Sequence, residues 1–447
     1  MQAQTQLSQF RDSINREYAE YLERSWEQFT LQQAKQVPVT PLPDEDTRYI
    51  EDKDTNPPTE VVVDSIVPTP LYQSVEKFPS VDTQKKKTEE TIKLSYFDTP
   101  IEISKFEGFG RRLVNVQEKQ IASFWRQLSH TPYQQLIQEL LDVKEEMYLN
   151  DWGFYQLILQ VSDVYYLPVQ VNEKTVFSIF ILNQTGYRAK IGRVGNTLIS
   201  LLAFQTEVYG KPFLHLPDGN YYVISADAIS GGQVFSYRLN YEPSKVSLNL
   251  TAKMPVRLSM QTKMREITVE KSKYTIEYNE NLITFYQAYP QTEFSVYANT
   301  PISVATCKSL EKELTPFLKE KSEREAVGYL IYFVQKGFAY KTDTEQLGHE
   351  KCFFAEEMFH FPFSDCEDRA ILFSHLVRSF LGLEVVLLDY DDHVATAVKF
   401  KSNEVSGDYV DINKERYVVC DPTYIGAPIG RAMTRYKNKK ARILFLN

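Results

Sequence analysis

The spacing of apolar side chains divides the chain into stretches of different character. Apolar residues recur at intervals of three and four over residues 6–34, which predicts an amphipathic N-terminal helix. Alternating apolar and polar positions over residues 233–278 predict a small antiparallel sheet. Helical spacing returns at residues 303–318 and 322–336. The chain is therefore predicted to have an α+β fold.

A proline-rich stretch without periodicity follows the first predicted helix. Eight of the 21 prolines lie between Pro38 and Pro79, interleaved with Asp, Glu and Thr. Proline fixes its own backbone and lacks an N–H donor, so neither a helix nor an inner strand is expected here. Residues 37–91 are predicted to form an extended linker or a segment draped over a domain.

The chain also contains a weak internal repeat. Sliding the sequence by 196 positions aligns Gly186 with Gly382 and Tyr221 with Tyr417 without a gap. Each half has two helical stretches upstream, residues 116–129 and 132–148 in the first half and those named above in the second. We interpret this pattern as an internal duplication.

A cysteine stands at the predicted start of a helix in the second half. Ser364 or Asp365 can cap this helix, which places Cys366 in its first turn, ahead of apolar residues at helical spacing. Unpaired backbone N–H groups and the positive end of the helix dipole favour a thiolate at such a position. Cys366 is therefore a candidate nucleophile.

Two later strands offer the partners that a cysteine nucleophile needs. His393 begins an alternating stretch 27 residues after Cys366, and Asp421 ends another one 28 residues after His393, directly before Pro422. A carboxylate bonded to one imidazole nitrogen fixes the tautomer, and the other nitrogen can then take the thiol proton. The order of the three residues is Cys, His, Asp.

These motifs resemble the transglutaminase-like superfamily, whose members are related to papain in fold. The resemblance rests on the Cys-x-Asp-x-Ala helix start at Cys366, the strand-borne His393 and the strand that ends Asp421-Pro-Thr-Tyr, and it covers residues 301–447. It implies acyl transfer through a thioester on peptide-like amides, with water or an amine as acceptor. It also implies an oxyanion site made by the nucleophile's backbone N–H and an upstream donor, for which Gln346 and Tyr340 are candidates that the spacing does not separate.

The first copy lacks these chemical groups. At the offset of 196, Cys366 falls on Gln170, His393 on Thr197 and Asp421 on Ser225. We therefore expect a degenerate copy that kept its fold and shapes the cleft or binds a partner. The predicted organisation is an N-terminal helix (1–36), the linker (37–91), the degenerate copy (92–230), a small β-rich module (231–300) and the catalytic domain (301–447).

A metal site is the competing chemical interpretation. His349, Cys352, His360 and Cys366 supply soft ligands, but their spacings do not form the paired units that zinc sites usually show. No phosphate-binding Gly-rich loop is present either. We therefore expect neither a metal nor another cofactor.

The composition limits the classes of partner that we expect for this protein. The 447 residues carry a net charge of -9, which argues against nucleic acid, and no apolar run approaches the ~18 residues of a membrane span. Four cysteines are too few for a disulfide framework. No signal peptide is visible after Met1, yet the resemblance favours an exported bacterial protein, in the periplasm or at the cell surface, whose signal is absent from this sequence.

The sequence leaves two function classes open. One is a cysteine protease, amidase or transglutaminase-like acyltransferase with a protein or peptide substrate. The other is a binding or assembly protein that uses transglutaminase-like domains as scaffolds. Papain-like enzymes are often covered by their own N-terminal segments, and the sequence leaves open whether residues 1–90 occlude Cys366. The oligomeric state stays open.

Overall fold

The computed structural model describes residues 2–37, 47–49, 57–68, 90–224, 232–402 and 405–446. The chain forms two compact units, and both mix helices with strands, which confirms the α+β prediction. The first unit comprises Met1–Gln36, Tyr72–Leu250 and Arg257–Ser259, and the second comprises Val37–Leu71, Thr251–Val256 and Met260–Asn447.

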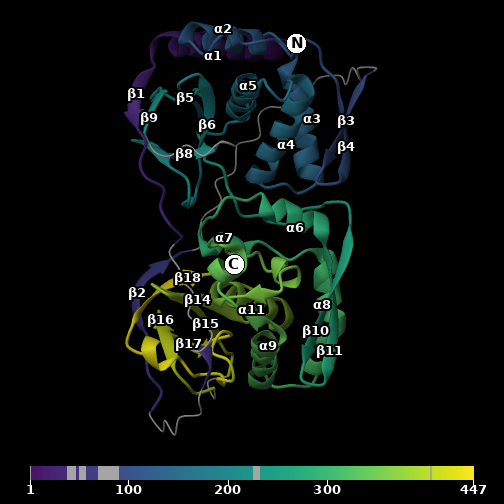
Figure 1. The fold of residues 1–447 in the computed structure, drawn as a ribbon, viewed down its shortest axis with the longest axis vertical. Helices are drawn as coiled ribbons and strands as arrows, with labels where there is room; N and C mark the ends of the chain where they lie inside the picture. The colour runs from purple at the N-terminus through teal and green to yellow at the C-terminus, as the bar shows by residue number, and fades with distance from the viewer. Residues whose placement is uncertain are drawn as a thin grey trace. The chain divides into compact units, whose positions relative to one another are not determined.

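The first unit contains a six-stranded sheet, drawn at the left of this unit in Figure 1, with α5 beside it. The helices of this unit are α1 (Gln2–Arg24), α2 (Glu118–Ser129), α3 (Tyr133–Glu146), α4 (Asp151–Tyr165) and α5 (Val171–Gln184). Its strands are β1 (Glu27–Thr30), β3 (Thr91–Tyr96), β4 (Thr99–Ser104), β5 (Ala189–Val194), β6 (Thr197–Ala203), β7 (Phe213–Leu216), β8 (Gly219–Ile224) and β9 (Gln233–Ser236). Helix α5 packs on β5 and β6, α2 packs on α5, and α1 packs on α2.

The second unit is also built on a six-stranded sheet. Its helices are α6 (Glu280–Gln287), α7 (Phe294–Asn299), α8 (Val304–Leu318), α9 (Glu323–Gly337), α10 (Asp343–Leu347) and α11 (Cys366–Leu381), with short 3-10 turns η2 (Glu357–Phe359) and η3 (Thr434–Tyr436). Its strands are β2 (Val62–Val67), β10 (Thr262–Val269), β11 (Ser272–Asn279), β12 (Ala339–Tyr340), β13 (Phe363–Ser364), β14 (Glu384–Tyr390), β15 (His393–Lys399), β16 (Tyr409–Ile412), β17 (Glu415–Cys420) and β18 (Lys440–Phe445). Helix α11 packs on β14 and β15.

The two sheets have the same strand order. The first runs β1-β9-β5-β6-β8-β7, and the second, taken from its opposite edge, runs β2-β18-β14-β15-β17-β16. In both, a long helix leads into the central hairpin and packs against it. The edge strands differ, because β1 pairs antiparallel with β9 whereas β2 pairs parallel with β18.

The pairing register is also the same at an offset of 196. In the central hairpins Ala189 pairs with Leu202, and Val385 pairs with Val398. The neighbouring pairs follow the same shift: Ser200 with Ile224 and Thr396 with Cys420, then Phe213 with Tyr222 and Tyr409 with Val418. A slip of one residue would turn every side chain to the other face, so a shared register across three strand pairs supports an internal duplication.

The predicted helices are present, but their correspondence between the halves was wrong by one helix. Helices α2 and α3 confirm the two predicted in the first half, and α8 and α9 confirm those of the second. However, α3 and α4 pack on the hairpin β3–β4 as α8 and α9 pack on the hairpin β10–β11. The structural counterparts are therefore α3 with α8 and α4 with α9. The sequence comparison missed α4 because its apolar residues surround it on several faces.

The N-terminal helix is shorter than predicted. It ends at Arg24, and residues that had been assigned to it form β1, whose half-buried and exposed positions alternate. Phe29 and Leu31 of this stretch pack into the core of the first sheet. Pairing with β9 thus overrides the helical spacing that these apolar residues share with α1.

The predicted β-rich module at residues 231–300 does not form a sheet of its own. Strand β9 joins the first sheet, and Val246 and Leu248 make single bridges to Tyr187 and Phe204. No strand covers residues 256–260, while the hairpin β10–β11 belongs to the second unit. The alternation reflects side chains that are buried on one face, but these side chains pack against segments that are distant in sequence rather than against one another.

The described parts of the proline-rich stretch are draped over the second unit. Strand β2 is an edge strand of that sheet, and Val61 lies in its core. Thr59 donates its backbone N–H to the buried Asp408 at 2.8 Å. The remainder of residues 37–91, apart from 47–49 and the stretch around β2, lies largely outside the described residues.

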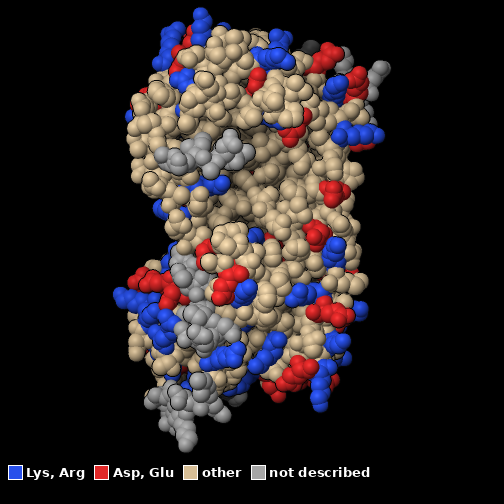
Figure 2. Space-filling view, in the orientation of Figure 1, with Lys and Arg blue, Asp and Glu red and all other residues tan. Residues whose placement is uncertain are grey.

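Two surface properties bear on partners. Among the described residues, no helix combines the length and apolarity needed to cross a lipid bilayer. On the face drawn in Figure 2, Lys and Arg side chains are interspersed with Asp and Glu rather than gathered into one field.

Candidate active site

The candidate nucleophile lies where the sequence predicts it, at the first position of a helix. Helix α11 begins at Cys366, and Asp365 occupies the N-cap position. The Asp368 carboxylate accepts hydrogen bonds from the backbone N–H of Asp365 at 3.3 Å and of Phe353 at 2.8 Å. These bonds fix the helix start, and packing of α11 on β14 and β15 holds it beside the strand that His393 begins.

His393 and Asp421 form a buried pair. Strands β15 and β17 pair antiparallel, which brings the first residue of one next to the residue that follows the other. His393 Nε2 lies 2.8 Å from Asp421 Oδ2. The other carboxylate oxygen of Asp421 accepts the backbone N–H groups of Thr423 at 2.9 Å and Tyr424 at 3.2 Å. The structure thus joins the two residues as the sequence predicts and orients the carboxylate on both sides.

The loop that carries Asp421 is held by one buried glutamine. Gln335, on α9, donates through Nε2 to the backbone carbonyls of Asp421 at 3.1 Å and Tyr424 at 2.9 Å. Its Oε1 accepts the backbone N–H of Gly426 at 3.0 Å. Sequence reasoning did not find this positioning residue, because it lies 86 positions before Asp421.

The second nitrogen of the His393 ring is available for proton transfer. Within the described part of the chain, Nδ1 is buried and has no hydrogen-bond partner. The ring stacks on Tyr436, with centroids 4.8 Å apart, and the Tyr436 hydroxyl donates to Asp392 at 2.9 Å. A rigid aromatic neighbour therefore fixes the plane of the imidazole.

The thiol of Cys366 is fully buried and is bonded to a carboxylate rather than to the histidine. Its Sγ donates to Glu367 Oε2 at 3.1 Å. Burial raises the pKa of the thiol well above its usual value, and the charges of Glu367 and Asp365 raise it further. The helix start was expected to lower this pKa, but burial first and the adjacent carboxylates second raise it in this state. A hydrogen bond from the backbone of Val394, next to His393, acts in the opposite direction.

The two oxyanion candidates have different surroundings. Tyr340 lies on β12, which pairs with β13 directly before the helix start, and the charges of Cys366, Asp365 and Glu367 raise the pKa of its hydroxyl beyond the effect of burial. The side chain of Gln346 is hydrogen-bonded to the backbone of Phe363. Its Oε1 accepts the Phe363 N–H at 3.1 Å, and its Nε2 donates to the Phe363 carbonyl at 3.4 Å. The surroundings favour Tyr340 over Gln346 as a donor near the thiol.

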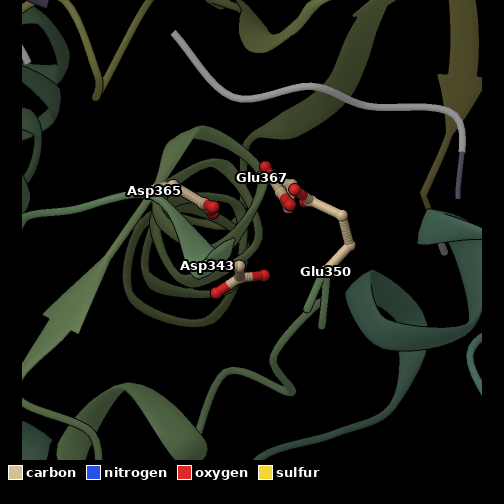
Figure 3. Close-up of side chains that lie close together, drawn as sticks. All are labelled: Asp343, Glu350, Asp365 and Glu367. Atoms are coloured by element: carbon tan, nitrogen blue, oxygen red, sulfur yellow. The ribbon is translucent and has the colours of Figure 1, made fainter. Parts of the chain in front are cut away.

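The soft-ligand metal site considered from the sequence does not assemble. His349 is exposed, whereas Cys352 is buried and His360 lies beside Glu280, with Nδ1 3.4 Å from Oε2. In the described residues, the side chains that could hold a metal ion form a different group, composed of carboxylates alone: Asp343, Glu350, Asp365 and Glu367 (Figure 3). Sequence reasoning missed it, although the acidic residues on both sides of Cys366 were a visible signal.

The first unit holds other residues at the corresponding places. Gln170 is the N-cap of α5 and accepts the N–H of Leu167 at 2.9 Å, and Thr197 is the first residue of β6. Ser225 lies outside the described residues.

Residues before β2 contact the loop that follows Asp421. The backbone of Ile425 pairs with Thr47 and Tyr49, and the rings of Tyr49 and Tyr424 meet edge to face at 5.3 Å. Whether the N-terminal segment covers Cys366 stays an open question.

Comparison with known proteins gives no further guide. No protein-family model, curated protein or solved structure matches this chain. A proposal for the function of this protein therefore rests on the geometry of the site and on the sequence motifs.

Proposed function

We propose that the second unit is a transglutaminase-like cysteine hydrolase or acyltransferase that acts on peptide-like amides. The observation that carries the proposal is the orientation of His393. Its Nε2 is bonded to Asp421, and its Nδ1 is buried, with no partner among the described residues, beside the helix that begins at Cys366. A histidine anchored on one nitrogen and open on the other is what a thiol nucleophile needs.

In the first step the thiol proton moves to Nδ1 of His393, and the sulfur attacks the amide carbon of the substrate. The carbonyl oxygen takes the negative charge in a tetrahedral intermediate. When this intermediate collapses, the C–N bond breaks and the leaving amine takes the proton back from His393, which leaves a thioester on Cys366. Asp421 stays ionised and stabilises the imidazolium.

In the second step the thioester is cleaved by an acceptor. Water or a primary amine gives its proton to His393 while attacking the thioester carbon, and the thiolate that leaves recovers this proton. Hydrolysis and amine transfer therefore need the same three residues, and the acceptor decides between a protease or amidase and a transglutaminase.

The oxyanion has two candidate donors at the helix start. One is the backbone N–H of Cys366, which lies in the first turn of α11 and has no partner within the helix. The other is the hydroxyl of Tyr340, which stays protonated because burial and nearby negative charges raise its pKa. Preorganised donors of this kind stabilise a developing negative charge without reorganising.

The test is capture of the acyl-enzyme with an activated ester that needs no specific recognition. The full chain is incubated with p-nitrophenyl acetate, and peptide mapping by mass spectrometry locates the acetyl group. We expect a burst of p-nitrophenol and an acetyl thioester on Cys366 that a primary amine removes. Acetylation confined to lysines and to the partly exposed Cys307, with Cys366 unmodified, would contradict the proposal.

A binding or assembly function is the second candidate, and one observation favours it. The thiol is fully buried and engaged by Glu367, so this state cannot attack a substrate without rearranging. Under this alternative, Cys366→Ala leaves partner binding intact and the acyl-enzyme never forms. From the resemblance alone, we also propose an exported bacterial setting for either function.

A further inference from the structure

Four carboxylates converge beside the candidate nucleophile, and the described residues place no basic side chain among them. One oxygen from each of Asp343, Glu350, Asp365 and Glu367 lies within 4.8 Å of the others. Figure 3 shows that they come from α10, from the loop after it and from the start of α11, and that they point toward one another. Three of the four side chains are buried.

Three of these carboxylates accept a hydrogen bond through only one of their two oxygens. Asp343 Oδ2 accepts the N–H of Lys351 at 2.7 Å, Glu350 Oε1 accepts the hydroxyl of Thr344 at 3.0 Å, and Glu367 Oε2 accepts the thiol. Among the residues that the structure describes, the other oxygen of each of these carboxylates is buried with no hydrogen-bond partner, and so are both oxygens of Asp365.

Asp365 is the strongest single observation. It is fully buried, and no cap hydrogen bond of the usual geometry reaches its carboxylate. Acidic residues at helix starts ordinarily accept backbone N–H groups, which would explain their presence without a ligand. Asp365 and Asp368 do adopt the arrangement of a capping box, but within the described residues neither oxygen of Asp365 has a hydrogen-bond partner of ordinary geometry, so the cap alone does not satisfy this carboxylate.

Buried carboxylates without donors are costly unless a cation or protons neutralise them. Lys351 does not supply the missing charge, because its ammonium group is bonded to Glu357 at 2.7 Å.

We propose that Asp343, Glu350, Asp365 and Glu367 form a binding site for one divalent cation, and that this cation is calcium. Carboxylate oxygens select hard cations, and the group offers no imidazole or thiolate ligand that would favour zinc or copper. Calcium takes six to eight oxygens at about 2.3–2.6 Å, so ligands on opposite sides of the ion lie about 4.8 Å apart. Magnesium needs shorter, octahedral geometry and keeps more of its water.

The least buried of the four carboxylates marks the side from which an ion would enter. Glu350 is half buried and follows the exposed Gly348 and His349. The positive end of α11 opposes a cation, but its half charge is small beside four carboxylates.

The cation connects the site to the candidate nucleophile. Asp365 and Glu367 flank Cys366 in the chain, and Glu367 is the group that holds the thiol. An ion that engages Glu367 would draw this carboxylate into the metal site and release the thiol toward His393. The binding site itself does not depend on the proposed catalysis.

Calorimetric titration and thermal unfolding of the full chain test the inference. The protein is treated with a chelator, dialysed and titrated with CaCl2 and, separately, MgCl2. We expect one saturable calcium site, weaker magnesium binding and a rise in the unfolding temperature with calcium. Glu350→Gln, at the half-buried position, should weaken calcium binding by about tenfold or more, because the charge of the ligands sets the affinity.

Two further variants separate the calcium site from a general effect of surface charge and from the catalytic proposal. Glu345→Gln, on the exposed side of α10, should bind calcium like the wild type. Cys366→Ala should also bind calcium, so the site can stand even if the catalytic proposal fails. Absence of calcium binding by the wild type, or equal binding by Glu350→Gln, would overturn the inference, and tighter binding of magnesium would overturn the assignment to calcium.

Discussion

The two units show one scaffold with and without a chemical site. Their sheets share strand order and register, yet the helix start that carries Cys366 in the second unit carries Gln170 in the first. The two carboxylates that flank Cys366 correspond at the same offset to Val169 and Val171, both exposed. The nucleophile and half of the proposed cation site are therefore present together in one unit and absent together from the other.

The first unit also has a polar residue at a position where the second unit is apolar. Lys190, on β5, is fully buried and corresponds to Val386 on β14, which is buried in the second core. The first sheet thus holds a buried lysine where the second sheet has an apolar side chain. The comparison teaches that this scaffold is stabilised by its apolar pairing pattern, and that polar groups at the helix start and on the strands can be exchanged without loss of the fold.

The largest expected effect concerns the residue that orients the histidine. Asp421→Asn should lower the acylation rate of Cys366 by roughly 10³–10⁴-fold, because the amide no longer fixes the required tautomer. The burst of p-nitrophenol measures this rate. Asp411→Asn, at an exposed position on the neighbouring strand β16, is the matched control and should acylate normally. Equal rates for the two variants would remove Asp421 from the mechanism.

The second prediction asks whether the units unfold separately. Leu201→Ala should destabilise the first unit by about 2–5 kcal/mol, since it opens a cavity in the core of β6, where the second sheet already has Ala397. Scanning calorimetry should show one transition shifted and the other unchanged. The control Leu239→Ala, at an exposed side chain, should shift neither. A single transition that moves as a whole would show that the units unfold together.

The buried lysine gives the first unit a pH dependence of its own. Burial lowers the pKa of Lys190 to about 7, although Asp218 opposes the shift and Arg188 adds to it. Its ammonium group lies over the rings of Tyr221 and Tyr237 and donates to a backbone carbonyl.

Between pH 7 and the usual lysine pKa of about 10.4, the unfolded state binds the proton that the folded state has lost. The free energy of unfolding of the first unit should therefore rise by about 2–3 kcal/mol from pH 7 to pH 9. Urea unfolding at the two pH values measures the change. Lys190→Met should abolish this rise, and an unchanged rise in that variant would assign it to other groups.

The smallest expected effect concerns the loop after β17. Gln335→Leu removes the hydrogen bonds that hold the backbone of Asp421, Tyr424 and Gly426, and should cost about 1–3 kcal/mol of stability because buried carbonyls lose their donor. Acylation of Cys366 should also slow, since Asp421 loses its fixed position. Lys336→Leu, next along α9, is the control. Normal stability together with normal acylation in Gln335→Leu would show that the loop needs no such anchor.

Local patterns predicted the parts of the site that depend on local structure. A capping residue before an apolar helical run located the start of α11, and alternation located the strands that begin at His393 and end before Asp421. Their order along the chain, taken with the resemblance to the transglutaminase-like superfamily, predicted the His–Asp pair, and the antiparallel pairing of β15 with β17 brings the two residues together.

Features that depend on distant pairing could not be predicted in this way. Strand β1 looks helical in sequence until β9 is known to pair with it, and the alternation after residue 233 is shared between both units. The sequence did not predict the carboxylate group for the same reason. Asp343 and Glu350 reach Asp365 only because the loop after α10 folds back, and no local spacing encodes that return.

The central claim is that the second unit holds a cysteine activated by His393, and alkylation kinetics test it most directly. The full chain is treated with iodoacetamide at neutral pH in calcium-containing buffer, and peptide mapping follows Cys366 with Cys307 as the ordinary thiol in the same molecule. The account predicts that Cys366 reacts faster than Cys307 and that His393→Ala removes the difference. Slow labelling of Cys366 that is the same in wild type and His393→Ala would contradict it.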